Sequence, residues 1–139
     1  MKETTFGEIN SNIGFYIGDI CYVLGDRLYH NVWGDQNGFK DGIIEDPITG
    51  LKAIVASTAY GDGEYTGSNG AHFPVDAGVI GAVPLELIEK KCGEDSGFVI
   101  NTSGTIVFSA HDGIFTIVLP NGALLTIDTN YDDDVEDCD

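Results

Sequence analysis

The sequence predicts an all-β protein, or a β protein with one short helix, arranged as an antiparallel sandwich or a partly open barrel. Three observations predict this fold class. Glycine supplies 19 of the 139 residues, which indicates many turns. Apolar residues make up 42% of the chain and aromatic residues 10%, as in a globular protein. The last third of the chain holds four apolar runs, separated by three-residue breaks that each end in glycine, which is typical of hairpin loops.

The chain is expected to begin with an arm and two strands. Residues 1–12 are mostly polar, and we expect them to form a flexible arm before a single β-rich domain over residues 13–130. The segment Ile13–Leu24 is rich in aromatic and β-branched residues, which predicts two β segments that break at Gly18-Asp19. Arg27–Trp33 fits either a strand or a short helix, and its periodicity does not decide between them.

The middle of the chain combines turn signals, a strand and a helix signal. Asn37-Gly38 is a strong turn signal, and Leu51–Ser57 alternates loosely like a strand. Ser57–Gly81 is dense in glycine and aromatic residues, and it ends in a buried-looking strand over Gly78–Val83. Pro84–Lys91 predicts a short helix, because proline suits a first turn, its acids come early and its lysines come late.

The C-terminal part predicts a four-stranded antiparallel meander followed by a disordered acidic tail over residues 131–139. The four runs are Phe98–Asn101, Thr105–Ala110, Ile114–Leu119 and Ala123–Thr129. These runs are apolar on both faces, so one side of the sheet is expected to pack against the first half of the chain and the other to meet a partner. Uncovered strand edges also invite pairing, and a homo-oligomer is therefore one expected assembly.

The net charge of −17 restricts the expected partners. Six of the acidic charges lie in the last eight residues, so the body carries about −11. Such a surface repels nucleic acid and anionic membranes, because phosphate binding depends on lysine and arginine. We therefore expect neither as a partner. A basic protein partner, divalent cations and simple solubility remain open as reasons for the charge.

The sequence favours a reduced, cytoplasmic protein. No apolar run approaches the ~20 residues that span a bilayer, and the first residues lack the apolar stretch of a signal peptide. The three cysteines, Cys21, Cys92 and Cys138, form no close pair and no Cys-x-x-Cys spacing, so we expect free thiols.

No local motif predicts a catalytic, metal or cofactor site. The three histidines have no His-x-His or His-Glu-x-x-His spacing. Asp35-Gln36-Asn37-Gly38 contains a fragment of a calcium loop but lacks the downstream glutamate. Thr66-Gly67-Ser68-Asn69-Gly70 lacks the strand–turn–helix context of a serine nucleophile. Gly61-Asp62-Gly63 has no lysine for phosphate, and its aspartate would repel one.

Four short segments together carry a family resemblance. They are Gly18-Asp19-Ile20-Cys21-Tyr22, Thr58-Ala59-Tyr60-Gly61-Asp62-Gly63-Glu64-Tyr65, Phe73-Pro74-Val75-Asp76-Ala77-Gly78 and Val83-Pro84-Leu85-Glu86-Leu87. The chain resembles small uncharacterised bacterial and phage proteins, in which a Gly-Asp-Pro-Cys-Tyr turn precedes a Tyr-Gly-Asp-Gly-x-Tyr-Pro-Val segment. The resemblance covers roughly Ile13 to Ile88 and implies a cytoplasmic, β-rich domain without an assigned activity. Ile20 replaces the proline, and an insertion over Thr66–Ala71 precedes Pro74-Val75.

The function that these observations favour is a non-catalytic acidic binding module that engages a protein partner. The residues expected to bind are those of the glycine-rich stretch that carry rings or charges: Tyr60, Asp62, Glu64, Tyr65, His72, Phe73 and Asp76. One alternative is a small hydrolase that uses Asp62, Glu64 and His72, which must then converge in a pocket. Another is an acidic anti-defence protein that mimics nucleic acid, which predicts carboxylates in rows across a face.

Overall fold

The computed structural model describes residues 4–130, apart from the side chains of residues 91, 92 and 94. The strands are β1 (Thr4–Ser11), β2 (Phe15–Gly18), β3 (Gly42–Glu45), β4 (Lys52–Ser57), β5 (Gly63–Thr66), β6 (His72–Val75), β7 (Val79–Pro84), β8 (Phe98–Ile100), β9 (Gly104–His111), β10 (Ile114–Val118) and β11 (Leu124–Asp128). The helical segments are η1 (Ile20–Tyr22), η2 (Arg27–Gln36), η3 (Leu85–Leu87) and η4 (Lys91–Ser96). The predicted acidic tail over residues 131–139 lies outside the described residues.

The described strands form two larger antiparallel sheets and one hairpin. The first sheet has the order β1-β9-β10-β11, the second has the order β3-β4-β7-β2-β8, and β5 pairs with β6. All of these pairs are antiparallel. The sheets do not close into a barrel within the described residues, and η2 is a single helix of ten residues. The predicted fold class, β-rich and antiparallel with one short helix, is therefore confirmed.

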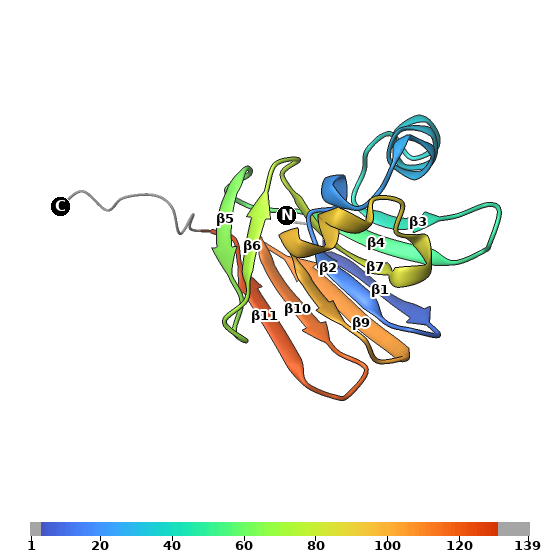
Figure 1. Ribbon diagram of the computed structural model, residues 1–139. Coiled ribbons are helices and arrows are strands. Elements are labelled where there is room, and N and C mark those ends of the chain that lie inside the picture. The colour runs from blue at the N-terminus through green and yellow to red at the C-terminus, as the bar shows by residue number, and fades with distance from the viewer. Residues whose placement is uncertain (1–3, 131–139) are drawn as a thin grey trace.

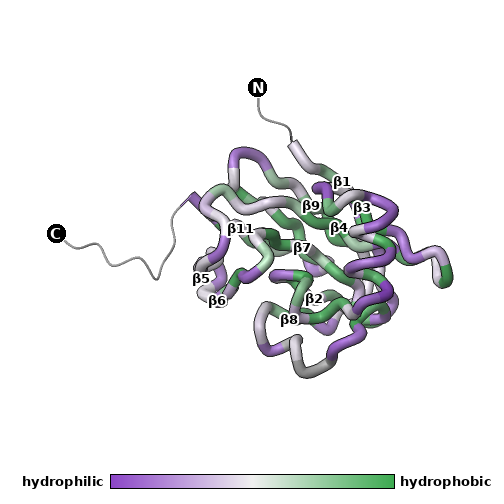
Figure 2. Tube along the Cα trace, turned by 90° about the horizontal axis from the view of Figure 1, so that it is seen from above, coloured by the Kyte–Doolittle hydropathy of each residue, from purple (hydrophilic) through white to green (hydrophobic). Residues whose placement is uncertain are grey.

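The main core lies between the two larger sheets, with the β5–β6 hairpin at one end. It contains inward residues from both sheets, such as Ile9, Ile54, Phe108 and Phe115, all fully or almost fully buried. Figure 1 shows β9, β10 and β11 on one side of the molecule, with β2, β4 and β7 next to them. In Figure 2 apolar segments run through the interior strands, while many of the connecting turns are hydrophilic. Burial of this interior apolar surface drives the packing of the two sheets.

A second core covers the opposite face of the five-stranded sheet. Leu28, Val32 and Trp33 of η2 pack there against sheet residues such as Val55 and Val83. The helix is a π-helix, which is wider than an α-helix, and its buried residues are four and one positions apart. The sequence leaves Arg27–Trp33 open between strand and helix, and the structure shows that it is helical. In this conformation its apolar residues form one stripe, which packs on the sheet. The molecule has three layers, sheet on sheet and helix on sheet (Figure 1).

The N-terminal segment differs from the predicted flexible arm. Residues Thr4–Ser11 form β1, which pairs with β9 along its whole length. Ile9 points into the core, and Gly7 lies so close to Ile54 that a Cβ atom would come within 2.8 Å of its side chain. The segment looks polar in sequence because its alternate residues face solvent, and few of its inward positions carry large apolar side chains.

The first strand of the predicted four-stranded meander belongs to the other sheet. β9, β10 and β11 form the expected hairpins, but Phe98–Ile100 forms β8 and pairs with β2. The fourth strand of the C-terminal sheet is β1. Gly97, just before β8, lies against the backbone of Ile17, where a Cβ atom would come within 2.5 Å of the carbonyl oxygen. This close approach, available only to glycine, brings β8 beside β2.

The predicted helix over Pro84–Lys91 is wrong. Strand β7 continues through Pro84, η3 occupies only Leu85–Leu87, and Ile88 returns to an extended conformation. The amides of Glu89 and Lys90 both donate to the carbonyl of Val23, so tertiary hydrogen bonds replace helical ones. A segment this short gains too little from local hydrogen bonds to form a helix against such competition.

Candidate functional site

A buried carboxylate joins two distant parts of the chain at one end of the second sheet. Asp19, fully buried between β2 and η1, accepts a hydrogen bond from the Cys21 amide at 2.9 Å through Oδ1. Its Oδ2 accepts from the amides of Asp76 and Ala77, both at 2.7 Å. The turn after β2 is therefore fixed to the loop between β6 and β7. The segments Gly18–Tyr22 and Phe73–Gly78 therefore meet at this carboxylate.

Two tyrosines beside Asp19 stay neutral. The Tyr16 hydroxyl donates to the carbonyl of Asp19 at 3.0 Å, and burial, followed by the Asp19 charge, raises the pKa of Tyr16. Burial, together with the neighbouring carboxylate of Asp76, also raises the pKa of Tyr22. Both side chains therefore act as hydrogen-bonding groups, since neither loses its proton near neutral pH.

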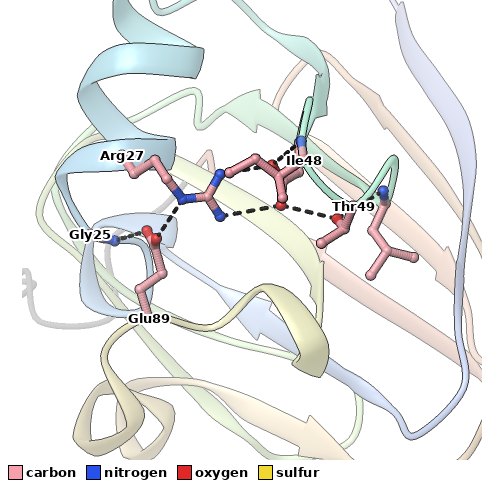
Figure 3. Close-up of polar contacts among 7 residues, drawn as sticks. Gly25, Arg27, Ile48, Thr49 and Glu89 are labelled. Atoms are coloured by element: carbon pink, nitrogen blue, oxygen red, sulfur yellow. Dashed lines mark hydrogen bonds and ion pairs between the residues drawn. The ribbon is translucent and has the colours of Figure 1, made fainter.

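A second polar network fixes the start of η2. The Arg27 guanidinium donates to both carboxylate oxygens of Asp46, at 2.7 and 3.2 Å, and lies 3.3 Å from a carboxylate oxygen of Glu89. Figure 3 shows the Arg27 side chain between Glu89 and the turn that contains Ile48 and Thr49. Asp46 also accepts from the Ile48 amide and the Thr49 hydroxyl, and Glu89 accepts from the Gly25 amide at 2.7 Å.

These two networks frame a small pocket between η1, η2 and Lys90. The pocket has a volume of about 220 Å³ and is lined by Cys21, Leu24, Gly25, Asp26, Tyr29, His30 and Lys90. The Lys90 ammonium donates to the carbonyl of Cys21 at 3.3 Å, and His30 Nδ1 lies 3.0 Å from an Asp26 carboxylate oxygen. Ligand pockets commonly measure roughly 300–1,000 Å³, so this pocket suits one side chain or a small group.

The thiol in this pocket is poorly suited to nucleophilic chemistry. Burial, and next the nearby Asp19 carboxylate, raise the pKa of Cys21 to about 12. A thiol with such a pKa stays protonated at neutral pH, whereas a nucleophile or metal ligand requires the thiolate. The pocket therefore offers binding contacts and no activated sulfur.

The raised pKa predicts slow alkylation of Cys21. At about pH 8 we expect iodoacetamide to modify Cys21 up to about a thousandfold more slowly in the folded protein than in urea, because the thiolate is scarce. Peptide mapping by mass spectrometry over a time course measures the rate at this residue. Equal rates in the folded and unfolded protein would contradict the assignment.

An aromatic platform lies beside the pocket; we use this name for the rings of Tyr29, His30 and Phe39. Tyr29 contacts His30 and Phe39 at ring-centroid distances of 5.0 and 5.9 Å. Trp33 lies buried beneath them, 5.1 Å from Phe39, and its Nε1 donates to the carbonyl of Lys40 at 2.8 Å. The Phe39 ring lies over Gly34, where a Cβ atom would come within 2.6 Å of it. Trp33 and Gly34 together fix the loop that presents Phe39.

The residues predicted to bind are only partly at the surface. Tyr65 and Phe73 are fully buried, opposite each other in the β5–β6 hairpin, and the Tyr65 hydroxyl donates to the carbonyl of Gly61 at 2.6 Å. These two rings close the end of the main core, so neither is available to a partner. Tyr60, Asp62, His72 and Asp76 are exposed, and Glu64 is half-buried.

Two of the three side chains of the hydrolase alternative, Glu64 and His72, lie on the β5–β6 strand pair. His72 Nδ1 is 3.8 Å from a carboxylate oxygen of Glu64, which is longer than a hydrogen bond, and the His72 side chain is 66% exposed. The Asp62 carboxylate lies near Gly78, at the loop before β7. Across the described residues, no group of three or more histidines, cysteines and acids has the arrangement to hold a metal ion.

The sequence alone does not predict a site at the pocket and the platform. Tyr29, His30 and Trp33 fall in the segment whose periodicity was ambiguous, and the π-helical spacing explains the ambiguity. The signal that points to them is the concentration of four rings between residues 29 and 39.

Comparison of the chain with protein-family models, with curated proteins and with solved structures finds no significant match. No helix in the described part of the chain is long and apolar enough to cross a membrane.

Proposed function

We propose that the protein is a binding module without a catalytic step, which docks a positively charged segment of a protein partner onto the aromatic platform. The observation that carries the proposal is the exposed ring of Phe39. Phe39 is 51% exposed, and its backbone has φ 56°, a conformation that bulky residues rarely adopt. Such a conformation costs about 1–3 kcal/mol and persists only where the surroundings impose it. Here Trp33 holds the chain on both sides of the Phe39 ring, because its carbonyl accepts from the Phe39 amide and its Nε1 donates to the carbonyl of Lys40.

The charge near the platform favours a cationic partner. Asp26 contacts His30 and is 95% exposed, and Asp35 and Asp41 are exposed on the same helix and the following loop. Arg27 is paired with Asp46 and Glu89 and so does not neutralise these acids. The net charge of −17 also leaves the chain with a large excess of acids over lysines and arginines. Such a field steers cationic partners toward the surface.

The rings supply the contact energy that charge alone lacks. A guanidinium or ammonium group over an aromatic face gains roughly 0.5–2 kcal/mol, more as the contact loses water. Aromatic side chains are also frequent at the positions that dominate binding energy. The neighbouring pocket, about 220 Å³ in volume, gives room for the aliphatic part of one such side chain.

The proposal predicts that Phe39→Ala weakens binding of a basic peptide. The probe is a labelled twelve-residue peptide of alternating arginine and glycine, and fluorescence anisotropy measures its dissociation constant. We expect Phe39→Ala to raise that constant about tenfold, because the loss of one anchoring ring costs about 1.4 kcal/mol. Asp26→Asn should weaken binding less and reduce its dependence on salt.

The matched control is Ile48→Ala, which removes another exposed apolar side chain, 75% exposed, on the turn between β3 and β4. It should leave the dissociation constant unchanged. Equal effects of Phe39→Ala and Ile48→Ala would show that the peptide responds only to total charge. That result, or no effect of Phe39→Ala in a protein that still unfolds cooperatively, would refute the proposal.

A further inference from the structure

We propose that two copies of this chain associate through the outward face of the sheet β1-β9-β10-β11. This outward face is defined by the side chains of Phe6, Val107, Ile114, Thr116, Val118 and Leu124. It is distinct from the aromatic platform, which lies on the helical layer over the other sheet.

The strand register gathers apolar side chains on this face. Val107, Val118 and Leu124 occupy one row across β9, β10 and β11, and Phe6 begins the next row on β1. Phe6, Ile114, Val118 and Leu124 are between 36% and 63% exposed. They are four of the nine large apolar side chains that are exposed among the described residues. Apolar groups gathered on one uncovered face mark an interaction surface more than scattered ones do.

No helix or strand of the described residues packs on this outward face. One edge of the sheet, along β11, is covered by residues 67 and 68. The helix η2 packs on the opposite sheet, and the alternate residues of β9 and β10 face inward into the main core. At the β11 edge, Gly67 bridges to Ile127, and Ser68 exchanges hydrogen bonds with Thr126. Because that edge is already occupied, a second copy meets the sheet at its face rather than by adding a strand to β11.

The distribution of charge on this face favours a second copy of the chain over a basic partner. The outward positions of the central strands β9 and β10 carry no acid, and the acids of this face, Glu8 and Asp128, lie on the outer strands β1 and β11. Two chains of net charge −17 repel each other over surfaces that carry acids. A second copy can approach closely where the centre is neutral and the acids stay at a solvated rim. A basic partner, in contrast, gains little charge attraction from this centre.

A two-fold axis through this face satisfies the geometry. In a symmetric dimer the same patch serves both subunits, so a self-complementary surface must be uncharged at its centre. The rows of valine, leucine and threonine on this face meet that condition, because sheets pack face to face through such side chains. The isologous contact places Val118 and Thr116 of each copy near the middle of the interface.

Sedimentation equilibrium of the full chain tests the dimer. We expect a dimer whose dissociation constant falls as salt rises to about 0.5 M, since salt screens the repulsion between two anionic chains and strengthens apolar contact. Val118→Glu and Thr116→Glu should each raise the dissociation constant about tenfold or more, because they put like charges at the centre of the interface. Thr116 is already exposed and polar, so its substitution leaves the fold intact.

The matched control is Ile48→Glu, which adds the same charge to an exposed apolar position on the turn between β3 and β4, outside the outward face defined above. It should change the dissociation constant less than about twofold. A monomer at millimolar concentration in high salt would overturn the proposal. So would a dimer that weakens as salt rises, or a dimer that Thr116→Glu and Ile48→Glu affect equally.

Discussion

Asp19→Ala is expected to lower the free energy of unfolding by about 4 kcal/mol, because it leaves three backbone amides without their acceptor. The amides of Cys21, Asp76 and Ala77 all donate to this one carboxylate, at 2.7 to 2.9 Å. Each buried donor that loses its partner costs about 1–3 kcal/mol, and water that enters the space recovers part of the loss. Domains of this size are commonly stable by about 5–15 kcal/mol, so the variant would be close to unfolding.

Urea denaturation followed by circular dichroism measures this effect. Asp19→Asn keeps the shape and one acceptor oxygen, and we expect it to cost about 2 kcal/mol, so it gives a reading even where the alanine variant fails to fold. The matched control is Asp35→Ala, an exposed acid on η2, whose loss should change stability by less than about 0.5 kcal/mol. Asp19→Asn and Asp35→Ala variants of equal stability would show that the buried carboxylate is not what fixes the turn.

The same contacts connect stability to the pocket. Asp19 fixes the backbone of Cys21, and the carbonyl of Cys21 accepts from Lys90 across the pocket. A variant that frees this turn therefore disturbs the pocket wall as well as the core. Asp19 also ties the segment Gly18–Tyr22 to the segment Phe73–Gly78, because its carboxylate accepts from the backbone amides of Asp76 and Ala77.

The C-terminal hairpins were predictable because their signals are local. Asp112 and Gly113 both have positive φ, 54° and 79°, as the tight turn between two adjacent strands requires. Asp-Gly is among the dipeptides that adopt this geometry, and the flanking runs in β9 and β10 are rich in apolar residues and are buried at alternate positions. The turn residues and the strand pattern thus specify the same hairpin without help from the rest of the chain.

The pairing of β1 and of β8 was not predictable, because their partner strands are distant in sequence. β1 pairs with a strand about one hundred residues later, and β8 pairs with β2 across the other sheet. The local sequence pattern of residues 4–11 and 98–100 does not predict which strands they pair with. The assignment of β8 to the second sheet depends instead on the close contact of Gly97 with Ile17, a tertiary feature.

The candidate site was only partly predictable for a related reason. The glycine-rich stretch was interpreted as a binding loop, but Tyr65 and Phe73 alternate with the less buried Glu64, Thr66, His72 and Pro74. Alternation with period two is the pattern of strands with one buried face, and it indicates core rings rather than exposed ones. For Phe39 no local signal existed, because its exposure depends on the hydrogen bond between Trp33 and Lys40.

Acid is expected to destabilise the protein through Asp46 below about pH 4. The Arg27 hydrogen bonds, followed by those of the Ile48 amide and the Thr49 hydroxyl, overcome the effect of burial and lower the pKa of Asp46 from 3.8 to about 2. The folded state therefore holds this proton less tightly than the unfolded chain. The contribution is complete above about pH 4 and is lost as the pH falls through about 2, and it amounts to about 2 kcal/mol.

Comparison of the wild-type protein with Asp46→Asn isolates this contribution. At about pH 7 the substitution should cost about 2–3 kcal/mol, because Arg27 loses a charged partner while its partly exposed guanidinium regains water. Between about pH 4 and pH 2 the difference in urea midpoints should shrink toward zero. Protonation of Asp46 removes the negative charge in the wild-type protein, and asparagine has already removed it in the variant. Asp35→Asn, which changes an exposed acid, should run parallel to the wild-type curve. A constant difference between the wild-type protein and Asp46→Asn across this range would mean that the Arg27–Asp46 contact acts through shape and not through charge.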